Sequence, residues 1–213
     1  MTAALILVDL QNDFLPGGAL GVPHGDEVIA AANLLIPEFD LVYATQDWHP
    51  ANHSSFASMH AGRAPGDTVR VEGRDQILWP DHCVQDTPGA EFACRLNWID
   101  TMRVIRKGTD PEIDSYSGFF DNGHTRSTGL DRALADQGVK RVYVLGLATD
   151  YCVRFTVIDA LQQGFAAHVV QDGCRGVNLS TGDVESAIHD MIAAGAVMTD
   201  SAGVLRRNRE CDL

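Results

Sequence analysis

Several features that would place this chain in other classes are missing from it. The sequence has no internal repeat, no low-complexity tract and no recognisable linker. Its start, MTAALILVDLQNDF, carries no basic residue before the apolar run, and Asp9 interrupts that run. We therefore expect neither a signal peptide nor a membrane span there. A chain of 213 residues of this kind suits one domain, residues 1–213.

Basic charge is also scarce. The chain has 16 Lys and Arg against 29 Asp and Glu, a formal net charge of −13. This balance argues against nonspecific nucleic-acid binding and against docking on anionic membranes, because both need clustered cations. The five cysteines are widely spaced, odd in number and form no CxxC pair. That pattern fits reduced thiols better than a disulfide framework, so we expect a cytoplasmic protein.

What the chain does have is an alternation of apolar runs and helical patterns. Continuous apolar runs indicate strands of a parallel sheet that is covered on both faces. The runs are Ala4–Val8, Leu41–Thr45, Met102–Arg106, Arg141–Leu145, Ala167–Val170 and a weaker Ala196–Thr199. The helical patterns are Asp26–Leu35, Ser127–Gln137, Cys152–Gln163 and Ser180–Gly195, with Asp26 and either Ser180 or Thr181 as N-caps. The sequence predicts a three-layer α/β/α fold with a mostly parallel, doubly wound sheet of about six strands.

One long segment does not fit this alternation. Residues 48–97 are rich in His, Pro, Gly and Asp and show little periodicity. A connection of that length inside a compact domain is usually functional or disordered. Its histidine and aromatic content favours a function, and we expect this loop region to carry a metal and substrate site.

Polar residues follow the predicted strands. Asp9, Asp47 and Lys107 come after the first three strands, and Asp172 after the fifth. Ligands of open α/β sheets bind outside the carboxyl ends of the strands. An Asp in such a place is often only a helix cap or a turn former, but the set as a whole indicates a site at this edge.

Cys152 lies where the fourth strand gives way to a helix, in VLGLATDYCVRFTV. The start of a helix lowers the pKa of a thiol, although a free cysteine is more commonly a small buried apolar residue. Asp9, Lys107 and Cys152 would supply an acid–base group, a cation and a nucleophile on adjacent strands. Nucleophilic catalysis needs that combination.

A metal site is indicated beside it. Asp47 and His49 are two residues apart, so an extended segment turns both side chains to one face. His82 follows farther along the irregular loop, and its neighbour Cys83 is a further candidate ligand. Carboxylate and imidazole suit Zn²⁺, Fe²⁺ or Mn²⁺. The alternative is a chance pairing, since histidines are scattered through the chain.

Five motifs taken together resemble a known family. They are LILVDLQNDFLPGGAL, ATQDWHPANHSSFA, LWPDHCVQDTPGAEF, RKGTD followed by YSGFFDN, and LGLATDYCVRFTVIDAL. In this order they resemble the nicotinamidases of the isochorismatase-like cysteine hydrolases, closest to the bacterial form that also hydrolyses pyrazinamide. The resemblance covers most of residues 4 to 163.

The resemblance implies roles for particular residues. The triad of the family falls on Asp9, Lys107 and Cys152, and its metal ligands fall on Asp47, His49 and His82. A fourth ligand of the metal is left open between Ser54, a water and His53. The pyridine-ring pocket falls on Phe14, Trp79 and Tyr116, and the oxyanion hole on the backbone N–H groups of Ala148 and Cys152, beside a cis peptide between Leu147 and Ala148.

The function implied by the resemblance is metal-dependent hydrolysis of nicotinamide to nicotinate and ammonia, through a thioester, in NAD salvage. Pyrazinamide would give pyrazinoate in the same way. One divalent metal ion is expected, zinc before iron or manganese. The partner is a small-molecule substrate, with no nucleic acid and no membrane, and a homo-oligomer is left open. The alternatives are another isochorismatase-like amidase, or a metal-binding module in which Cys152 is a regulatory thiol without turnover.

Overall fold

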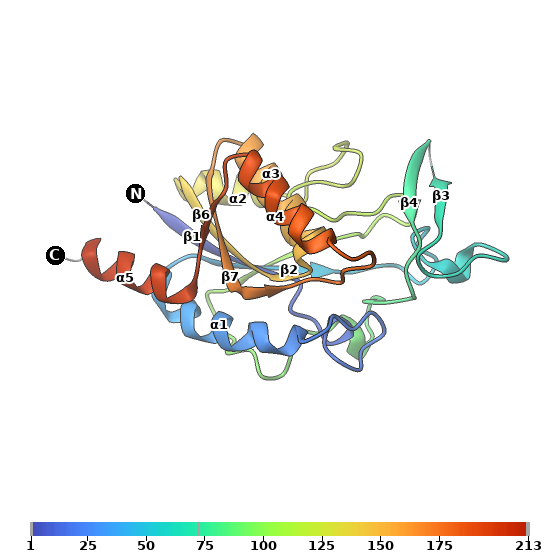
Figure 1. Ribbon diagram of the computed structural model, residues 1–213, viewed down its shortest axis with the longest axis horizontal. Helices are drawn as coiled ribbons and strands as arrows, with labels where there is room; N and C mark the ends of the chain where they lie inside the picture. Colours follow the sequence, from blue (N-terminus) through green and yellow to red (C-terminus); the bar gives the residue numbers. More distant parts are fainter. Residues whose placement is uncertain (1, 72, 212–213) are drawn as a thin grey trace.

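The molecule is built around a parallel sheet with helices on both faces (Figure 1). A computed structural model describes residues 2–71 and 73–211. The strands are β1 (Ala3–Val8), β2 (Val42–Asp47), β5 (Arg103–Lys107), β6 (Arg141–Leu147), β7 (Ala166–Arg175) and β8 (Val197–Thr199). Their order in the sheet is β5-β2-β1-β6-β7-β8, and every neighbouring pair is parallel. The predicted fold class is confirmed.

The helices form the two outer layers. They are α1 (Val28–Leu35), α2 (Leu130–Asp136), α3 (Arg154–Gln162), α4 (Asp183–Ala193) and α5 (Ser201–Cys211). Helices α1 and α5 cover one face of the sheet, and α2, α3 and α4 cover the other (Figure 1). Because both faces are covered, β1 and β2 are buried along almost their whole length, as their continuous apolar runs predict. None of the helices in the described part of the chain has the length and apolarity to cross a bilayer.

The chain order creates a switch point in the sheet. From β1 the chain proceeds outward to β2 and β5 on one side, and then crosses back to β6, β7 and β8 on the other. The carboxyl ends of β1 and β6 therefore diverge into connections that leave in opposite directions. In doubly wound sheets this is where a crevice for a ligand opens.

The helix starts differ from the prediction. α1 begins two residues after Asp26, behind a short 3-10 turn (Gly25–Glu27), and α4 is capped by Gly182 rather than by Ser180 or Thr181. The carboxylate of Asp183 accepts a hydrogen bond from the Ser180 N–H, so an acid inside the first turn closes the preceding loop. Neither α1 nor α4 has a side-chain cap at its N-terminus.

Two further differences lie in the sheet. β7 continues to Arg175, so Asp172 lies inside the strand instead of after it. Its carboxylate accepts hydrogen bonds from the backbone N–H and hydroxyl of Ser201 and thereby holds the start of α5, a helix that was not predicted. The irregular segment 48–97 also contains an antiparallel hairpin of β3 (Thr68–Val71) and β4 (Arg74–Ile77), which was not predicted either.

Candidate functional site

Lys107 is the centre of a buried ionic cluster. Its ammonium nitrogen lies 2.9 Å from Oδ2 of Asp9, 2.5 Å from Oδ1 of Asp47 and 3.4 Å from Sγ of Cys152. The Ser115 carbonyl accepts a further hydrogen bond from it at 3.0 Å. The lysine is 1 % exposed, so the charge is held by these partners and not by solvent. The three residues that were predicted to act together are in contact.

The elements that carry this cluster are arranged differently from the expectation of adjacent strands. Asp9 follows β1, Lys107 ends β5 and Cys152 follows β6. β2 lies between β1 and β5, so Lys107 reaches Asp9 across the end of β2, where Asp47 is the last residue. Asp47 fills the gap between the two strands. The metal and nucleophile clusters are therefore continuous.

Asp9 is held in one orientation by Thr45 of β2. Its backbone lies in the left-handed region, with φ of 52°, as the chain turns away from β1. The Thr45 hydroxyl donates to Oδ1 of Asp9 at 2.6 Å and accepts from the Asp9 N–H at 3.2 Å. Oδ2 of Asp9 faces the Lys107 ammonium, and the Asp9 carboxylate is within hydrogen-bonding reach of the Cys152 thiol.

Cys152 does not sit at the start of an α-helix. It lies within a π-helical turn (Thr149–Val153) that precedes α3, and the peptide bond between Leu147 and Ala148 just before this turn is cis, as the resemblance implies. Ala148 and Cys152 both line the same cavity. The turn presents the cysteine toward Asp9 and Lys107 at the end of β6.

Two opposing effects act on the thiol. Burial raises the pKa of Cys152 well above its ordinary value; Lys107 opposes this rise without cancelling it. Lys107 therefore favours the thiolate, as expected of a cation beside the nucleophile, while desolvation favours the neutral thiol. Burial also raises the pKa of Asp9, to about 6, against the lowering effect of Lys107. A carboxylate with that pKa is a stronger base than an ordinary Asp and lies beside the thiol proton.

Asp47, His49 and His82 form a set with the chemistry of a metal site. Their ligand atoms all lie within 4.8 Å of one another, and all three residues are buried. The Nδ1–H groups of His49 and His82 donate to the carbonyls of Gly108 and Pro80, each at 2.8 Å. These bonds fix both Nε2 atoms as lone-pair donors, the usual outer support of a metal-ligating histidine.

The pKa shifts favour metal-binding protonation states for Asp47 and His82, whereas the pKa of His49 is raised, because Asp47 beside it outweighs the lowering effect of burial. Burial alone would raise the pKa of Asp47, but Lys107 and His49 together hold it well below its ordinary value. Burial lowers the pKa of His82 to about 4, so its imidazole is neutral. An ionised carboxylate and a neutral imidazole are the protonation states in which these groups bind a divalent ion.

Ser54 and His53 were the protein candidates for the fourth ligand, and Cys83 was a further candidate ligand. The Ser54 backbone N–H donates to Pro111 O, and the ring of His60 donates to its carbonyl. His53 packs on His49, with ring centroids 4.3 Å apart. Cys83 is buried, its backbone N–H donating to Asp13 at 2.7 Å, and it belongs to none of the potential ligand sets among the described residues.

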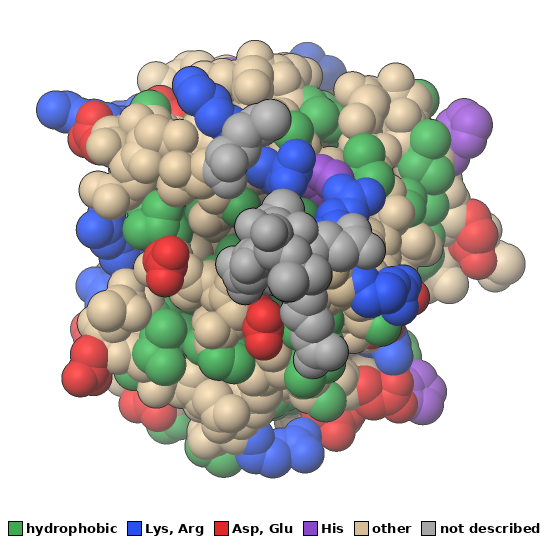
Figure 2. All heavy atoms as spheres, turned by 90° about the vertical axis from the view of Figure 1, so that its left-hand side faces the viewer, with side chains coloured by type: hydrophobic (Ala, Val, Ile, Leu, Met, Phe, Trp, Pro, Cys, Tyr) green, Lys and Arg blue, Asp and Glu red, His purple; other side chains and the backbone are tan. Residues whose placement is uncertain are grey.

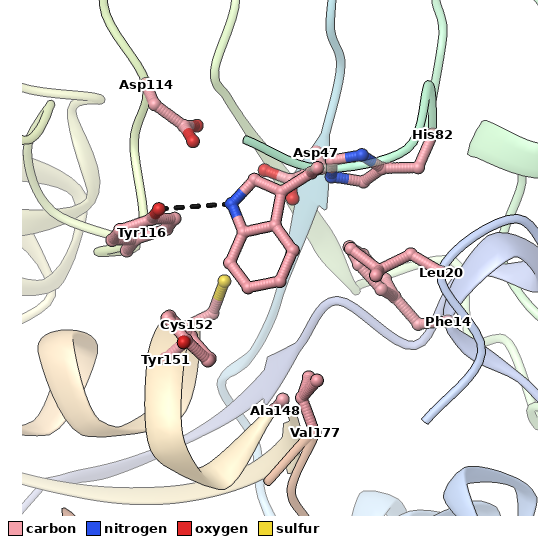
Figure 3. Close-up of a pocket in the computed structure, with 11 residues that line it drawn as sticks. Phe14, Leu20, Asp47, His82, Asp114, Tyr116, Ala148, Tyr151, Cys152 and Val177 are labelled. Atoms are coloured by element: carbon pink, nitrogen blue, oxygen red, sulfur yellow. Dashed lines mark hydrogen bonds between the residues drawn. The ribbon is translucent and has the colours of Figure 1, made fainter. Parts of the chain in front are cut away.

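The predicted aromatic residues surround one cavity. Phe14, Trp79 and Tyr116 line it together with Cys152, and the Trp79 indole N–H donates to the Tyr116 hydroxyl at 3.1 Å (Figure 3). His82 lies on the side of the cavity opposite Tyr116 and Cys152 (Figure 3), whereas a carboxylate oxygen of Asp47 lies within 4.8 Å of the Cys152 sulfur. A flat ring bound between the aromatic walls would have the thiol on one side and His82 on the other.

Four other residues that line the cavity were not predicted from the sequence. Leu20, Tyr151 and Val177 complete the apolar wall, and Asp114 adds a carboxylate. Tyr151 is the neighbour of Cys152, and its ring lies 4.9 Å from that of Trp79. Leu20, Asp114 and Val177 lie in loops without periodicity, so the sequence offered no signal for them.

Gln11 was not predicted either, and it supports the site through backbone contacts instead of lining the cavity. Its side-chain amide donates to the carbonyls of Asp47 and Ala90, and its Oε1 accepts from the Asp47 N–H at 2.7 Å. It fixes the backbone of the carboxylate that joins the two clusters. Its position two residues after Asp9, in VDLQNDF, is the only feature that could have drawn attention to it.

Known proteins resemble this chain both in sequence and in fold. The isochorismatase domain matches residues 3–203. The chain is 51 % identical to the nicotinamidase of Escherichia coli K12 over 199 residues, which is 92 % of this chain and 93 % of that protein. A solved nicotinamidase/pyrazinamidase of Acinetobacter baumanii superposes with a TM-score of 0.91 at 46 % identity, covering 94 % of this chain and 97 % of that one. A pyrazinamidase of Pyrococcus horikoshii in complex with zinc superposes at 0.78 with 40 % identity, covering 94 % and 99 %.

Proposed function

The chain belongs to the isochorismatase domain family, in its nicotinamidase branch, and from that premise we propose that it hydrolyses nicotinamide to nicotinate and ammonia. The observation that carries the proposal is the position of Lys107. Its ammonium contacts Asp9, Asp47 and Cys152 at once, beside one aromatic-lined cavity. A nucleophile, a base and a metal set therefore share one substrate-sized site.

The first half of the reaction is acyl transfer to sulfur. Asp9 takes the proton of Cys152 as the sulfur attacks the amide carbonyl, which overcomes the raised pKa of the thiol. The charge that develops on the carbonyl oxygen is met by the backbone N–H groups of Ala148 and Cys152, as the resemblance implies. Such donors stabilise the transition state, and losing one typically costs about 10²–10³ in rate. Asp9 then returns the proton to the leaving nitrogen, which departs as ammonia.

The second half consumes the thioester. A water molecule enters the place of the ammonia, Asp9 removes its proton, and the resulting hydroxide attacks the acyl carbon. The carbon–sulfur bond breaks, and the proton on Asp9 passes to the Cys152 thiolate. Nicotinic acid and the free thiol result, and the acid releases its proton to solvent as nicotinate, so one water is consumed for each amide. Lys107 stabilises the negative charge carried in turn by Asp9 and by the sulfur.

Asp47, His49 and His82 would hold one divalent ion, with Ser54 retained as a tentative further ligand. The donor set fits zinc, the metal in complex with the Pyrococcus horikoshii relative, with iron or manganese as alternatives. Such an ion would supply a Lewis acid beside the cavity, and it would serve to orient the ring nitrogen of the substrate, directly or through water. Phe14, Trp79 and Tyr116 supply the flat apolar slot around the ring.

The wider setting follows from the same proposal. Pyrazinamide differs by one ring nitrogen and fits the same slot, giving pyrazinoate. Removal of ammonia from nicotinamide belongs to NAD salvage. Cys83, Cys94, Cys152 and Cys174 are free thiols, which suits the reducing cytoplasm. We take residues 1–213 as one domain in which the 48–97 region carries metal and substrate residues.

The test is ammonia release from nicotinamide by the purified protein, before and after treatment with a chelator. We expect activity that falls on chelation and returns with one divalent metal. Cys152→Ala should abolish ammonia release and keep the metal content. Near wild-type turnover by that variant would overturn the nucleophile assignment. A folded, metal-replete protein that releases no ammonia would exclude nicotinamide and favour another amide or a regulatory thiol.

A further inference from the structure

Asp150 is a buried carboxylate in the same turn as Cys152, and it has no role in the reaction described above. It is 3 % exposed and belongs to the π-helical turn Thr149–Val153. One of its oxygens accepts from the Val177 N–H at 2.9 Å, and the other accepts from the Asn178 N–H at 2.6 Å. The carboxylate therefore ties the turn that carries the nucleophile to the segment that follows β7.

The segment that follows β7 passes through a narrow space. A Cβ built on Gly176 would lie 2.2 Å from Cγ2 of Val184 on α4 and 3.0 Å from Oδ1 of Asp150. Asn178 has φ of 57°, in the left-handed region that few residues other than glycine adopt. Its side-chain oxygen accepts only weakly from the Val184 N–H, at 3.4 Å. A segment in such a conformation needs firm partners to keep its shape, and Asp150 provides two hydrogen-bond acceptors at once.

Val177 connects this segment to the substrate cavity. Leu147 of β6 pairs with Arg175 of β7, so Ala148 and Val177 follow the ends of neighbouring strands. Both residues line the cavity, and Figure 3 shows them on its side away from His82. The carboxylate of the turn thus holds the backbone of a residue whose side chain forms part of the cavity wall.

We propose that Asp150 is a positioning residue that holds the side chain of Val177 against the ring of the bound amide. The proposal rests on the proposed function. Two N–H groups need two acceptors, and an ionised carboxylate offers an acceptor at each oxygen. The Val177 side chain is a small apolar surface, so its contact with a flat ring contributes to binding and not to the transfer of protons. Val177 therefore affects how tightly the amide binds, while the triad carries the chemical steps.

Two variants separate the carboxylate from the wall. Asp150→Asn keeps the shape but has one acceptor oxygen, so its NH₂ group faces one of the two N–H groups and that hydrogen bond is lost. Val177→Ala leaves the segment in place and shortens the wall by two methyl groups. In metal-replete protein we expect KM for nicotinamide to rise about tenfold in each variant, as for two buried methyl groups lost from a contact. We expect kcat to stay within about threefold of the wild type, the pattern of an interaction made equally in the ground and transition states.

Binding without turnover measures the same effect directly. In the metal-replete Cys152→Ala protein, calorimetry gives the dissociation constant of nicotinamide, and adding Asp150→Asn or Val177→Ala should raise it by the factor seen in KM. Adding both substitutions should weaken binding no more than the stronger of the two does alone, because both act on one wall. A protein with both that binds about a hundredfold more weakly, the product of two independent effects, would overturn the proposal.

Asp183→Asn is the matched control, since it removes the same charge nearby, at the start of α4. The Asp183 carboxylate accepts the Ser180 N–H at 2.8 Å, and this one hydrogen bond can pass to the side-chain oxygen of an asparagine. We expect wild-type KM and kcat in this variant. An Asp150→Asn protein with the KM of this control, or with a lower kcat and an unchanged KM, would overturn the proposal. So would an unchanged KM in the Val177→Ala protein.

Hydrogen exchange keeps this test apart from the proposed function. The amide hydrogens of Val177 and Asn178 should exchange faster in Asp150→Asn than in Asp183→Asn, whatever the substrate. If the wild type releases no ammonia and binds no nicotinamide, the proposed function is wrong, and the exchange rates alone decide whether Asp150 holds the segment. Faster exchange in Asp150→Asn then supports that hold, and equal exchange overturns it. If ammonia is released while exchange and KM are those of the control, the positioning role is wrong and the reaction remains.

Discussion

At the scale of single residues, Lys107 has two effects that oppose each other. It gives up hydration on burial, and it stabilises the negative charges of Asp9, Asp47 and any thiolate on Cys152. Since the pKa of Cys152 is raised even with this ammonium in contact, the lysine limits the cost of forming the thiolate and does not create one in advance.

Replacing the lysine tests that role. Lys107→Met should move the reaction of Cys152 with iodoacetamide to higher pH, because the charge that lowers the pKa of the thiol is gone. Labelling of the Cys152 peptide, followed by mass spectrometry over a pH series, measures this without interference from the exposed Cys94. Lys140→Met, an exposed lysine at the opposite end of β6, is the control with the same charge change. Identical profiles for both variants would contradict the role.

Asp9 should set the acid limb of activity. With its pKa raised to about 6, the carboxyl is protonated below that pH and cannot accept the thiol proton, so kcat/KM should rise with pH through about 6. Thr45→Val removes the hydroxyl that donates to the carboxylate at 2.6 Å and should shift this limb to higher pH. If kcat/KM of the Thr45→Val protein rises at the same pH as in the wild type, or at a lower pH, the group that determines this rise is not Asp9.

At the scale of elements, the turn that follows β5 shows how backbone supports the metal set. Gly108 has φ of 63°, its carbonyl accepts from His49, and a Cβ built on it would lie 2.3 Å from Cε1 of that ring. Only glycine lets the chain pass this close to the imidazole. The turn therefore fixes the position of one metal ligand.

Gly108→Ala should displace His49 and weaken zinc binding by about tenfold or more, within the range for lost support of a metal ligand. Zinc content after dialysis against a graded chelator measures it. Gly138→Ala is the matched control, because Gly138 also has positive φ, 65°, but open space around its Cβ position. It should lose some stability and keep its zinc. Equal zinc binding by both variants would show that the turn does not hold the ligand.

The elements also show what the sequence can predict. The apolar runs identified all six strands of the main sheet. For β1, β2 and β6 the reason is that a strand buried on both faces tolerates little else, whereas the edge strands β5 and β8 are partly exposed. The β3–β4 hairpin was not predicted, since Thr68–Val71 and Arg74–Ile77 form no continuous apolar run and half of their residues are exposed. Helix α5 was not predicted, because the contact that fixes its start joins Ser201 to Asp172, 29 positions earlier in the chain. The sequence motifs predicted the triad and the metal residues. Gln11 and Asp114 were not predicted, because only tertiary contacts bring them to the site.

At the scale of the whole molecule, the two ends of the sheet differ. The site occupies the carboxyl ends of the strands, and His168 of β7 is buried nearer the opposite end, stacked on Tyr143 with ring centroids 4.9 Å apart. Burial, with help from Arg141 and Arg207, lowers the pKa of His168 to about 4. Figure 2 shows the face where both chain termini lie, with Lys and Arg side chains gathered beside a histidine.

This histidine should make the fold less stable in mild acid. Between pH 6.5 and about 4 the unfolded chain protonates His168 and the folded chain does not, so the free energy of unfolding falls as the pH is lowered through that window. His168→Phe, which keeps a ring on Tyr143, should show a flatter dependence in urea titrations at several pH values. His189→Gln, at an exposed position on α4, should follow the wild type. If the free energy of unfolding of His168→Phe depends on pH as steeply as that of the wild type, another group causes the sensitivity to acid.

The strand order has a practical consequence for dividing the chain. A cut at the exposed turn of Gln137 and Gly138 leaves β5-β2-β1 on one fragment and β6-β7-β8 on the other, each an unbroken half of the sheet. The first fragment keeps Asp9, Lys107 and the whole metal set, and the second keeps Cys152. Neither piece holds the whole triad. The two meet in the sheet along β1 against β6, and α1 of the first piece packs on β7 and α5 of the second. Fused to two other proteins, they would be expected to serve as a complementation reporter, in which ammonia is released only when the two carriers associate.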